Sequence, residues 1–395
     1  MINNKTIILS ILLSIANITG SSGLTIWIDK TLKEGGEILN TYAPMFSYLI
    51  GLSIGCMTIS FLIRKIRSVF LKKNIFILSL SLAAINCFLF SKEWMVISVW
   101  VDATHRIIWG VMSGFTVILG RNILITEGNE KKTNKSFSIL SLALLCLPFL
   151  IPITFSFFNL NNRTSADLFS FIIYMISFVV YLVLNKDKTI KKNDAFPISS
   201  LKKNNRIVIL SFLNLVIINV CFFLLLMIMP AIRIMYFNYI DMTKMYIILL
   251  MIWFPCAIVI IMVTKSTKLE KKIIIGNMMQ LISLGLCFIS MNINSGILYV
   301  IFMLLIFLAN MIMQPIFFSY LGLYSKNSLY TFGMQSGSYV FITTIILLYT
   351  VFINLKTDKI IIGFTSLIIL SVINSIVFIF TAKRIKHKYN INNIK

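Results

Sequence analysis

The chain has few charged residues and very few histidines for its length. Charged residues make up 12% of its 395 residues and hydrophobic residues 58%, against about 25% and 45–50% in ordinary soluble domains. It has only 13 Asp and Glu residues and two His, so general acid–base catalysis and metal binding have few candidate groups. These shortages argue against a soluble enzyme and indicate a polytopic membrane protein.

Cysteine and glycine spacing also lacks the signs of a disulfide, metal or nucleotide site. All six cysteines fall inside apolar stretches: Cys56, Cys87, Cys146, Cys221, Cys256 and Cys287. None of them forms a C-x-x-C pair, and no Gly-rich phosphate loop occurs. A Cys or Ser nucleophile would need His105 or His387 as its base, and His387 lies in a basic tail. The sequence therefore predicts no enzyme activity, no cofactor and no bound metal.

Apolar segments of about 20 residues, the length that crosses a bilayer, recur along the whole chain. Twelve are present: 6–26, 41–63, 74–91, 94–120, 136–158, 167–185, 207–229, 244–264, 273–290, 296–318, 331–352 and 360–381. We therefore predict an all-α membrane protein with twelve transmembrane helices in two six-helix pseudo-repeats around a central cavity. The expected parts are an N-terminal half (1–185), a cytoplasmic linker (186–206), a C-terminal half (207–382) and a basic cytoplasmic tail (383–395).

The net charge of +23 comes from basic clusters in alternate loops. The clusters occupy 64–73, 121–135, 186–206, 265–272 and the end of the chain from Lys383. Because cytoplasmic loops carry an excess of Lys and Arg, both termini are predicted to be cytoplasmic in a bacterial inner membrane. Loops near Lys33, Arg163 and Arg233 then lie outside, and the first of them, 27–40, is expected to be a solvated connection. Charges placed in this way do not indicate binding of nucleic acid.

The fourth predicted span carries three ionisable residues. Asp102 precedes His105 by three positions and Arg106 by four, which places the carboxylate within reach of both bases on one helix surface. An ionisable group at bilayer depth costs roughly 2.5–3.5 kcal/mol, so it normally faces a cavity or a partner. Asp102 is the one acid that the pattern places well inside the membrane. We expect these three residues to couple transport to proton movement, with a structural ion pair as the alternative.

Polar residues at helical spacing mark the first, fourth, seventh and tenth spans. The candidate residues for a substrate cavity are Asn17, Ser21, Trp109, Ser113, Asn214, Asn310 and Gln314. Each face alone is better explained by hydrogen bonds between helices, worth about 0.6 kcal/mol on average. Four such faces at corresponding positions of the two halves favour a shared aqueous cavity.

The sequence RIIWGVMSG places Gly110 and Gly114 four and eight residues after Arg106. This segment resembles the fourth-span R-x-x-x-G motif of the major facilitator superfamily. The resemblance implies two six-helix halves that alternate access to a site near the middle of the membrane. It also implies a role for Arg106 in proton coupling.

Two other motifs of that superfamily are not kept. In the loop after the second span, Ser60, Arg64 and Arg67 stand where a glycine, an aspartate and a second glycine are usual. The fifth span has Leu147, Pro148 and Phe149 without the flanking glycines of the antiporter motif. These departures weaken the assignment to a subfamily and to a direction of transport.

Together these features predict a secondary active transporter that exports a small organic molecule, such as a drug, siderophore or peptide antibiotic, in exchange for protons. Its partners would be that small-molecule substrate, protons and the lipid bilayer, and it would act as a monomer. Because acids are scarce in the predicted cavity, a neutral, zwitterionic or anionic solute fits better than a dication. A proton-coupled importer of a nutrient and a flippase of another polytopic fold remain the alternatives.

Overall fold

A computed structural model of the protein describes residues 4–65, 69–92, 98–123, 130–160, 162–187, 205–236, 241–264, 268–293, 296–325, 328–353 and 357–392. These residues form α-helices and no β-strand. The helices are α1 (Asn4–Ser22), α2 (Thr25–Lys33), α3 (Ile38–Lys65), α4 (Val69–Phe90), α5 (Val99–Ile123), α6 (Glu130–Phe157), α7 (Arg163–Asp187), α8 (Asn205–Tyr236), α9 (Met242–Thr264), α10 (Leu269–Asn292), α11 (Gly296–Tyr324), α12 (Ser328–Ile353) and α13 (Thr357–Asn392).

Each of the twelve predicted spans coincides with one long helix, from α1 and α3 through to α13. Ten stretches of the described chain are long and apolar enough to cross a membrane. The other two long helices, α5 with 25 residues and α10 with 24, measure roughly 36 Å at 1.5 Å per residue, more than the hydrocarbon thickness of about 30 Å. The protein is therefore an all-α integral membrane protein with twelve transmembrane helices.

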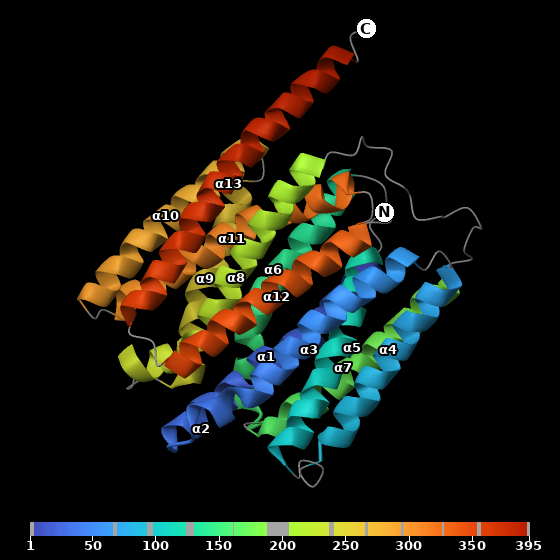
Figure 1. Ribbon diagram of the computed structural model, residues 1–395, viewed down its shortest axis with the longest axis vertical. Helices are drawn as coiled ribbons and strands as arrows, with labels where there is room; N and C mark the ends of the chain where they lie inside the picture. Colours follow the sequence, from blue (N-terminus) through green and yellow to red (C-terminus); the bar gives the residue numbers. More distant parts are fainter. Residues whose placement is uncertain are drawn as a thin grey trace.

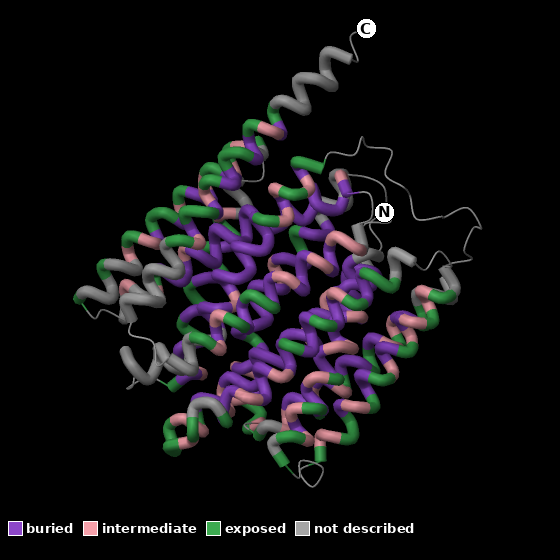
Figure 2. The backbone as a smooth tube through the Cα atoms, viewed as in Figure 1, coloured by how far each residue is buried: buried purple, intermediate pink, exposed green. Residues whose placement is uncertain are grey.

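Large apolar side chains cover the outside of the bundle. Leu78 and Ile85 on α4, Met251 on α9 and Phe380 on α13 are all more than half exposed. Figure 2 shows that buried residues gather where helices face each other, while exposed residues lie along the outer helices. A soluble protein rarely exposes so much contiguous apolar surface, and in a bilayer the same surface contacts lipid.

The helices form two groups, α1–α7 and α8–α13, called here the N-terminal and C-terminal halves. Between the halves, α3 packs against α12, and α6 packs against α9 and α11; Figure 1 shows α12 lying beside α3. Helix α1 begins and α13 ends on the side of the bundle opposite α2. Most of the predicted linker, 188–204, lies outside the described residues, and α13 continues through the predicted tail as far as Asn392.

The expectation of a solvated connection over 27–40 is wrong for its first part. Residues 25–33 form α2, in which Ile28 and Asp29 are buried. Lys33 at the end of α2 lies 3.3 Å from the Asp29 carboxylate and 3.5 Å from that of Asp241, just before α9. The segment is apolar enough on one face to pack against α8 and α9, so it joins the two halves at the end opposite the termini.

Helices α3 and α5 approach each other unusually closely. Gly51 and Gly55 on α3 face Gly110 and Gly114 on α5, an arrangement of small residues that lets membrane helices touch through their backbones. A Cβ added to Gly110 would lie 2.2 Å from the carbonyl oxygen of Tyr48. The glycines that follow Arg106 in the sequence therefore set the distance between α5 and α3, which fixes the position of the charged residues on α5.

Candidate functional site

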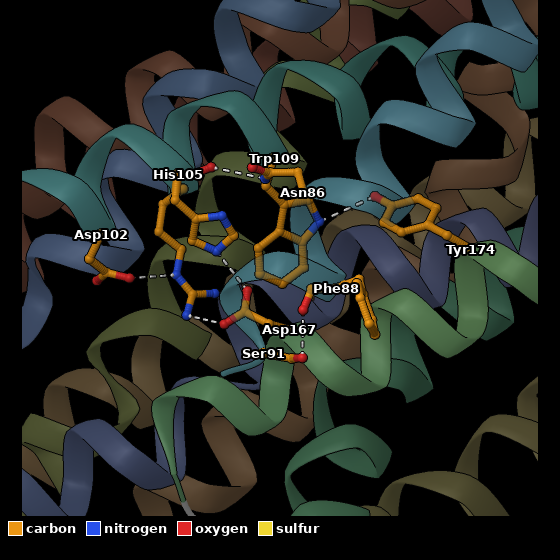
Figure 3. A network of polar contacts seen from close by, with 9 residues as sticks. Asn86, Phe88, Ser91, Asp102, His105, Trp109, Asp167 and Tyr174 are labelled. Carbon is orange, nitrogen blue, oxygen red and sulfur yellow. Dashed lines mark hydrogen bonds and ion pairs between the residues drawn. The ribbon is translucent and has the colours of Figure 1, made fainter. Parts of the chain in front are cut away.

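Four ionisable side chains from α5 and α7 form a buried cluster, called here the charged cluster (Figure 3): Asp102, His105, Arg106 and Asp167. Arg106 donates a hydrogen bond from Nη2 to Oδ2 of Asp167 at 2.9 Å. Nε2 of His105 lies 2.8 Å from the other carboxylate oxygen, Oδ1 of Asp167. Asp102 contacts Arg106 more loosely, with 3.5 Å between Oδ1 and Nε. None of the four residues is more than 2% exposed.

Asp167 corrects the expectation that Asp102 is the one acid inside the membrane. It lies one turn into α7 and is 1% exposed. In the sequence it stands at the very edge of the sixth predicted span, where an acid is ordinarily a boundary residue. The available signal was the polar series Asp167, Ser170, Tyr174 and Ser177, all buried, which follows one face of a helix.

The charged cluster lies toward one end of α5. Asp102 is in the first turn of the helix, while residues 94–97, which the sequence places in the fourth span, lie outside the described residues. By the topology predicted from loop charges, this end faces the outside. In that topology Arg106 and His105 are predicted to lie between the outer surface and the middle of the membrane.

His105 is held by contacts on several sides. Its ring stacks on Phe90 of α4, with 4.1 Å between ring centroids and 16° between ring planes. Its backbone carbonyl accepts a hydrogen bond from Nδ2 of Asn86 at 3.3 Å. An ionised carboxylate can only accept, so ionised Asp167 requires the proton on Nε2, while protonated Asp167 can itself donate. The pair can hold one exchangeable proton in either position.

An aromatic contact continues the charged cluster along α5. The Arg106 guanidinium lies 5.1 Å from the centre of the Trp109 ring, within the range of a cation–π interaction. Trp109 donates from Nε1 to the hydroxyl of Tyr174 at 3.3 Å, and the same hydroxyl lies 2.5 Å from Oγ of Ser113. Trp109 and Ser113 thus face α7 inside the N-terminal half.

Tyr48 connects Trp109 to α1. Its ring meets Trp109 edge-on with 5.1 Å between centroids. Its hydroxyl lies 2.6 Å from the backbone carbonyl of Asn17 and 2.8 Å from Oδ1 of the same residue. A chain of contacts therefore runs from Asp167 through Arg106, Trp109 and Tyr48 to Asn17.

Asn17 lines a small cavity between the halves. The lining residues are Asn17, Ile18, Ser21, Leu49, Leu52, Phe223, Tyr339, Val340 and Thr343. They come from α1 and α3 in one half and from α8 and α12 in the other. The volume is about 10 Å³, room for a single water, so this cavity is too small for a larger solute in this conformation. Of the predicted substrate residues, Asn17 and Ser21 lie on it.

The three amide side chains predicted to bind substrate in the C-terminal half differ in their hydrogen-bond partners. Asn214 donates to the carbonyl of Leu210 and accepts from Oγ of Ser375 at 3.0 Å, which ties α8 to α13. Gln314 donates from Nε2 to Oδ1 of Asn219 at 2.7 Å, a partner that the polar pattern did not single out. Asn310 is 1% exposed, and neither atom of its amide has a hydrogen-bond partner among the described residues. None of the three lines the small cavity, and their roles toward a substrate stay a prediction.

Comparison with known proteins identifies the class of fold. No family model matches the chain, and no curated protein matches it by sequence. The twelve-helix fold is that of major facilitator superfamily transporters. It is similar to a partially occluded, inward-open structure of the xylose transporter XylE from E. coli, with a TM-score of 0.66, 13% identity, and 94% of this chain and 98% of that chain covered. The human organic anion transporter MFSD10 (TETRAN) is similar with a TM-score of 0.61, 11% identity and the same coverage. Both of these proteins are transporters.

Proposed function

We propose that this protein is a proton-coupled secondary transporter of the bacterial inner membrane that exports a small organic molecule by alternating access. The observation that carries the proposal is Asp167, a fully buried carboxylate shared between Arg106 and His105 in a fold of transporters. Both termini face the cytoplasm, as the loop charges predict. The cavity lies between the two halves of one chain, which supports action as a monomer.

The coupling step is the protonation of Asp167. As long as Asp167 is ionised, it compensates the charge of Arg106, and both side chains are buried. A proton on Asp167 removes that compensation, and leaving a buried charge without its partner costs about 3–5 kcal/mol. Arg106 is then expected to move toward Asp102, 3.5 Å from its Nε. Asp102, His105 and Arg106 keep the roles predicted from the sequence, and Asp167 joins them as the group that exchanges the proton.

The contacts beyond Arg106 offer a route from protonation to the cavity. Trp109 lies under the guanidinium and against Tyr48, and Tyr48 holds Asn17 at the cavity wall. A displacement of Arg106 therefore changes the packing of Tyr48 and the position of Asn17. This chain of contacts relates the proton site to the substrate site.

The walls of the cavity favour a small amphipathic solute. Phe223, Leu49 and Leu52 supply apolar surface, and Asn17, Ser21 and Thr343 supply hydrogen-bonding groups, the usual composition of sites for small organic ligands. A drug, siderophore or peptide antibiotic fits this chemistry. An importer could be built from the same parts, and the two fold neighbours, which transport xylose and organic anions, do not decide the direction.

Vesicle transport under an imposed pH gradient tests the proposal. Inverted vesicles with an acidic lumen should accumulate labelled amphipathic solutes from a panel, and Asp167→Asn vesicles should not. Arg206→Gln, which removes an exposed side chain at the start of α8, is the matched control and should transport normally. Accumulation only by right-side-out vesicles in an acidic medium would make the protein an importer, and undiminished transport by Asp167→Asn would refute the coupling scheme.

A further inference from the structure

Arg121 lies inside the protein, although its place in the sequence predicts a loop residue. It occupies the last turn of α5 and is 4% exposed. Nη1 of Arg121 donates to Oγ of Ser336 on α12 at 2.7 Å. The guanidinium carbon lies 5.5 Å from the centre of the Phe318 ring on α11. The side chain therefore reaches from the N-terminal half into the C-terminal half.

No carboxylate of the described residues balances this buried charge. Within the described part of the chain, Arg121 makes no ion pair, and its Nε has no hydrogen-bond partner. Arg106, on the same helix, is held by two carboxylates. Nε2 of Gln335, beside Ser336, is a second buried donor without a partner in the described part of the chain. Buried cations ordinarily have a partner or face a functional site, so these donors are available to an anion.

Arg121 lies close to the cavity between the halves. Ser336 is one helical turn before Tyr339, which lines the cavity, a rise of about 4.5 Å along α12. The Tyr339 hydroxyl is itself an electrostatic and hydrogen-bonding neighbour of Arg121, while Nε of Arg121 has no partner among the described residues. Relative to the charged cluster, Arg121 lies at the other end of α5, which is the cytoplasmic end in the predicted topology. A solute that enters the cavity from the cytoplasm meets Arg121 on its way.

Close packing of α3 on α12 covers Arg121 in this conformation. Ser53 on α3 donates to the carbonyl of Gly337 at 3.0 Å. A Cβ on Gly333 would lie 1.6 Å from Oγ of Ser60, so the two helices touch without space for a larger residue. Separation of the halves at this level would break the contact of Arg121 with Ser336 and expose the guanidinium to the opening.

We propose that Arg121 is the anion-binding group of the transport path and that the solute is an organic anion whose carboxylate pairs with this guanidinium. The planar guanidinium fork matches a carboxylate in two parallel hydrogen bonds, and its unused Nε is the donor needed for the second. The inference rests on the proposed transport function and narrows the substrate class to organic anions.

Thermal unfolding of the purified full-length protein in detergent tests the inference, with matched pairs of an acid and its primary amide as probes. Benzoate is compared with benzamide, and indole-3-acetate with indole-3-acetamide, at constant ionic strength. The acids should raise the melting temperature of the wild-type protein more than their amides do. In Arg121→Gln the apparent affinity for the acids should fall roughly tenfold or more, because a charge-assisted hydrogen bond is lost. Arg206→Gln removes an exposed arginine at the start of α8 and should change nothing.

A second variant keeps Arg121 and fills its site. Ser336→Asp places a carboxylate where Oγ of Ser336 now contacts Nη1, so it should abolish the preference for acids without removing the arginine. Equal stabilisation by acids and amides in the wild-type protein would overturn the inference, as would a preserved preference in folded Arg121→Gln or in Ser336→Asp. The binding assay needs no proton gradient. If proton coupling is wrong, the result of this binding assay does not change. If anion binding is wrong, the result of the vesicle test of Asp167 does not change.

Discussion

The two halves of the protein bury polar groups of different kinds. The N-terminal half buries the charged cluster and Arg121 at opposite ends of α5. The described side chains of the C-terminal half that are buried and polar are hydroxyls and amides, such as Asn219, Asn310 and Gln314, and none is charged. The two halves share a helical architecture, but among the described residues only the N-terminal half buries charged side chains.

This difference suggests that the two halves have different functions. Charges inside a membrane are costly unless paired, and their pairing changes when a proton binds, so they suit a switch. Amides keep their hydrogen-bonding capacity at any pH near neutrality, so they suit a surface that binds a solute or fastens helices. On this view the N-terminal half responds to protons, and the C-terminal half supplies a wall that does not titrate.

Neutralising Asp167 should have the largest effect on stability and on the pH dependence of transport. In Asp167→Asn, Arg106 loses its closest carboxylate among the described residues, while Asp102 stays at 3.5 Å. Unfolding should then become easier by about 3 kcal/mol, and transport should no longer depend on pH. Gln314→Met removes an uncharged hydrogen bond, the one to Asn219 in the C-terminal half. This substitution should lower the free energy of unfolding by only about 0.6 kcal/mol. Denaturant titration of the purified proteins measures both. Equal losses in the two variants would show that charge does not distinguish the halves.

Two glycines, Gly110 in the N-terminal half and Gly285 in the C-terminal half, differ in how closely other atoms pack around them. A Cβ on Gly110 would lie 2.2 Å from a backbone oxygen of α3, whereas a Cβ on Gly285 of α10 would meet nothing within 4 Å. Gly110→Ala should therefore destabilise the protein by about 1–3 kcal/mol, because neither helix backbone can move aside easily. Gly285→Ala should be neutral or stabilise α10 by up to about 1 kcal/mol. Melting temperatures compare the two, and similar values would mean that α3 and α5 can separate without cost.

The number and order of the spanning helices follow from the sequence because hydrophobic length alone determines them. The pairing of Asp102 with Arg106 also follows, since the i,i+4 spacing is local. The role of Asp167 does not follow, because which face of α7 meets α5 depends on packing between helices. Arg121 shows the same limit. A basic residue at the end of an apolar run normally indicates a loop, and only the contact between α5 and α12 reveals its burial.

The predicted substrate residues show why polar faces are ambiguous in membrane helices. Asn17 and Ser21 reach the cavity, while Asn214 turns to Ser375 on α13. Both patterns have the same spacing in sequence, because a polar side chain in a membrane seeks a partner whether that partner is water or another helix. The short helix α2 escapes notice for a different reason, since nine residues are too few to span the bilayer.

The ion pair between Lys33 and Asp241 offers a smaller test at the contact between the halves. It joins α2 to the start of α9 at 3.5 Å, and both side chains are partly exposed, so its contribution should be at most about 1 kcal/mol. Asp241→Asn removes this ion pair. The fraction of molecules in which the two halves are separated at the end beside α2 should then rise by up to about fivefold. Labelling of Thr343→Cys by a membrane-impermeant thiol reagent measures that opening, in a background without the native cysteines. Unchanged labelling would mean that α2 does not help to close this end.

Asn214 is the smallest and most selective test, because the sequence places it in the cavity and the structure places it against α13. Asn214→Ala removes the hydrogen bonds to Leu210 and Ser375, which should cost about 0.6 kcal/mol of stability. Since Asn214 does not line the cavity, the apparent affinity for a transported solute should stay at the wild-type value. Asn17→Ala removes an amide that does line the cavity and should weaken that affinity. Concentration-dependent uptake by vesicles, with each variant's stability measured beside it, separates the two effects. A weaker affinity in Asn214→Ala at normal stability would return this residue to the substrate path, and the C-terminal half would then contribute through α8 as well.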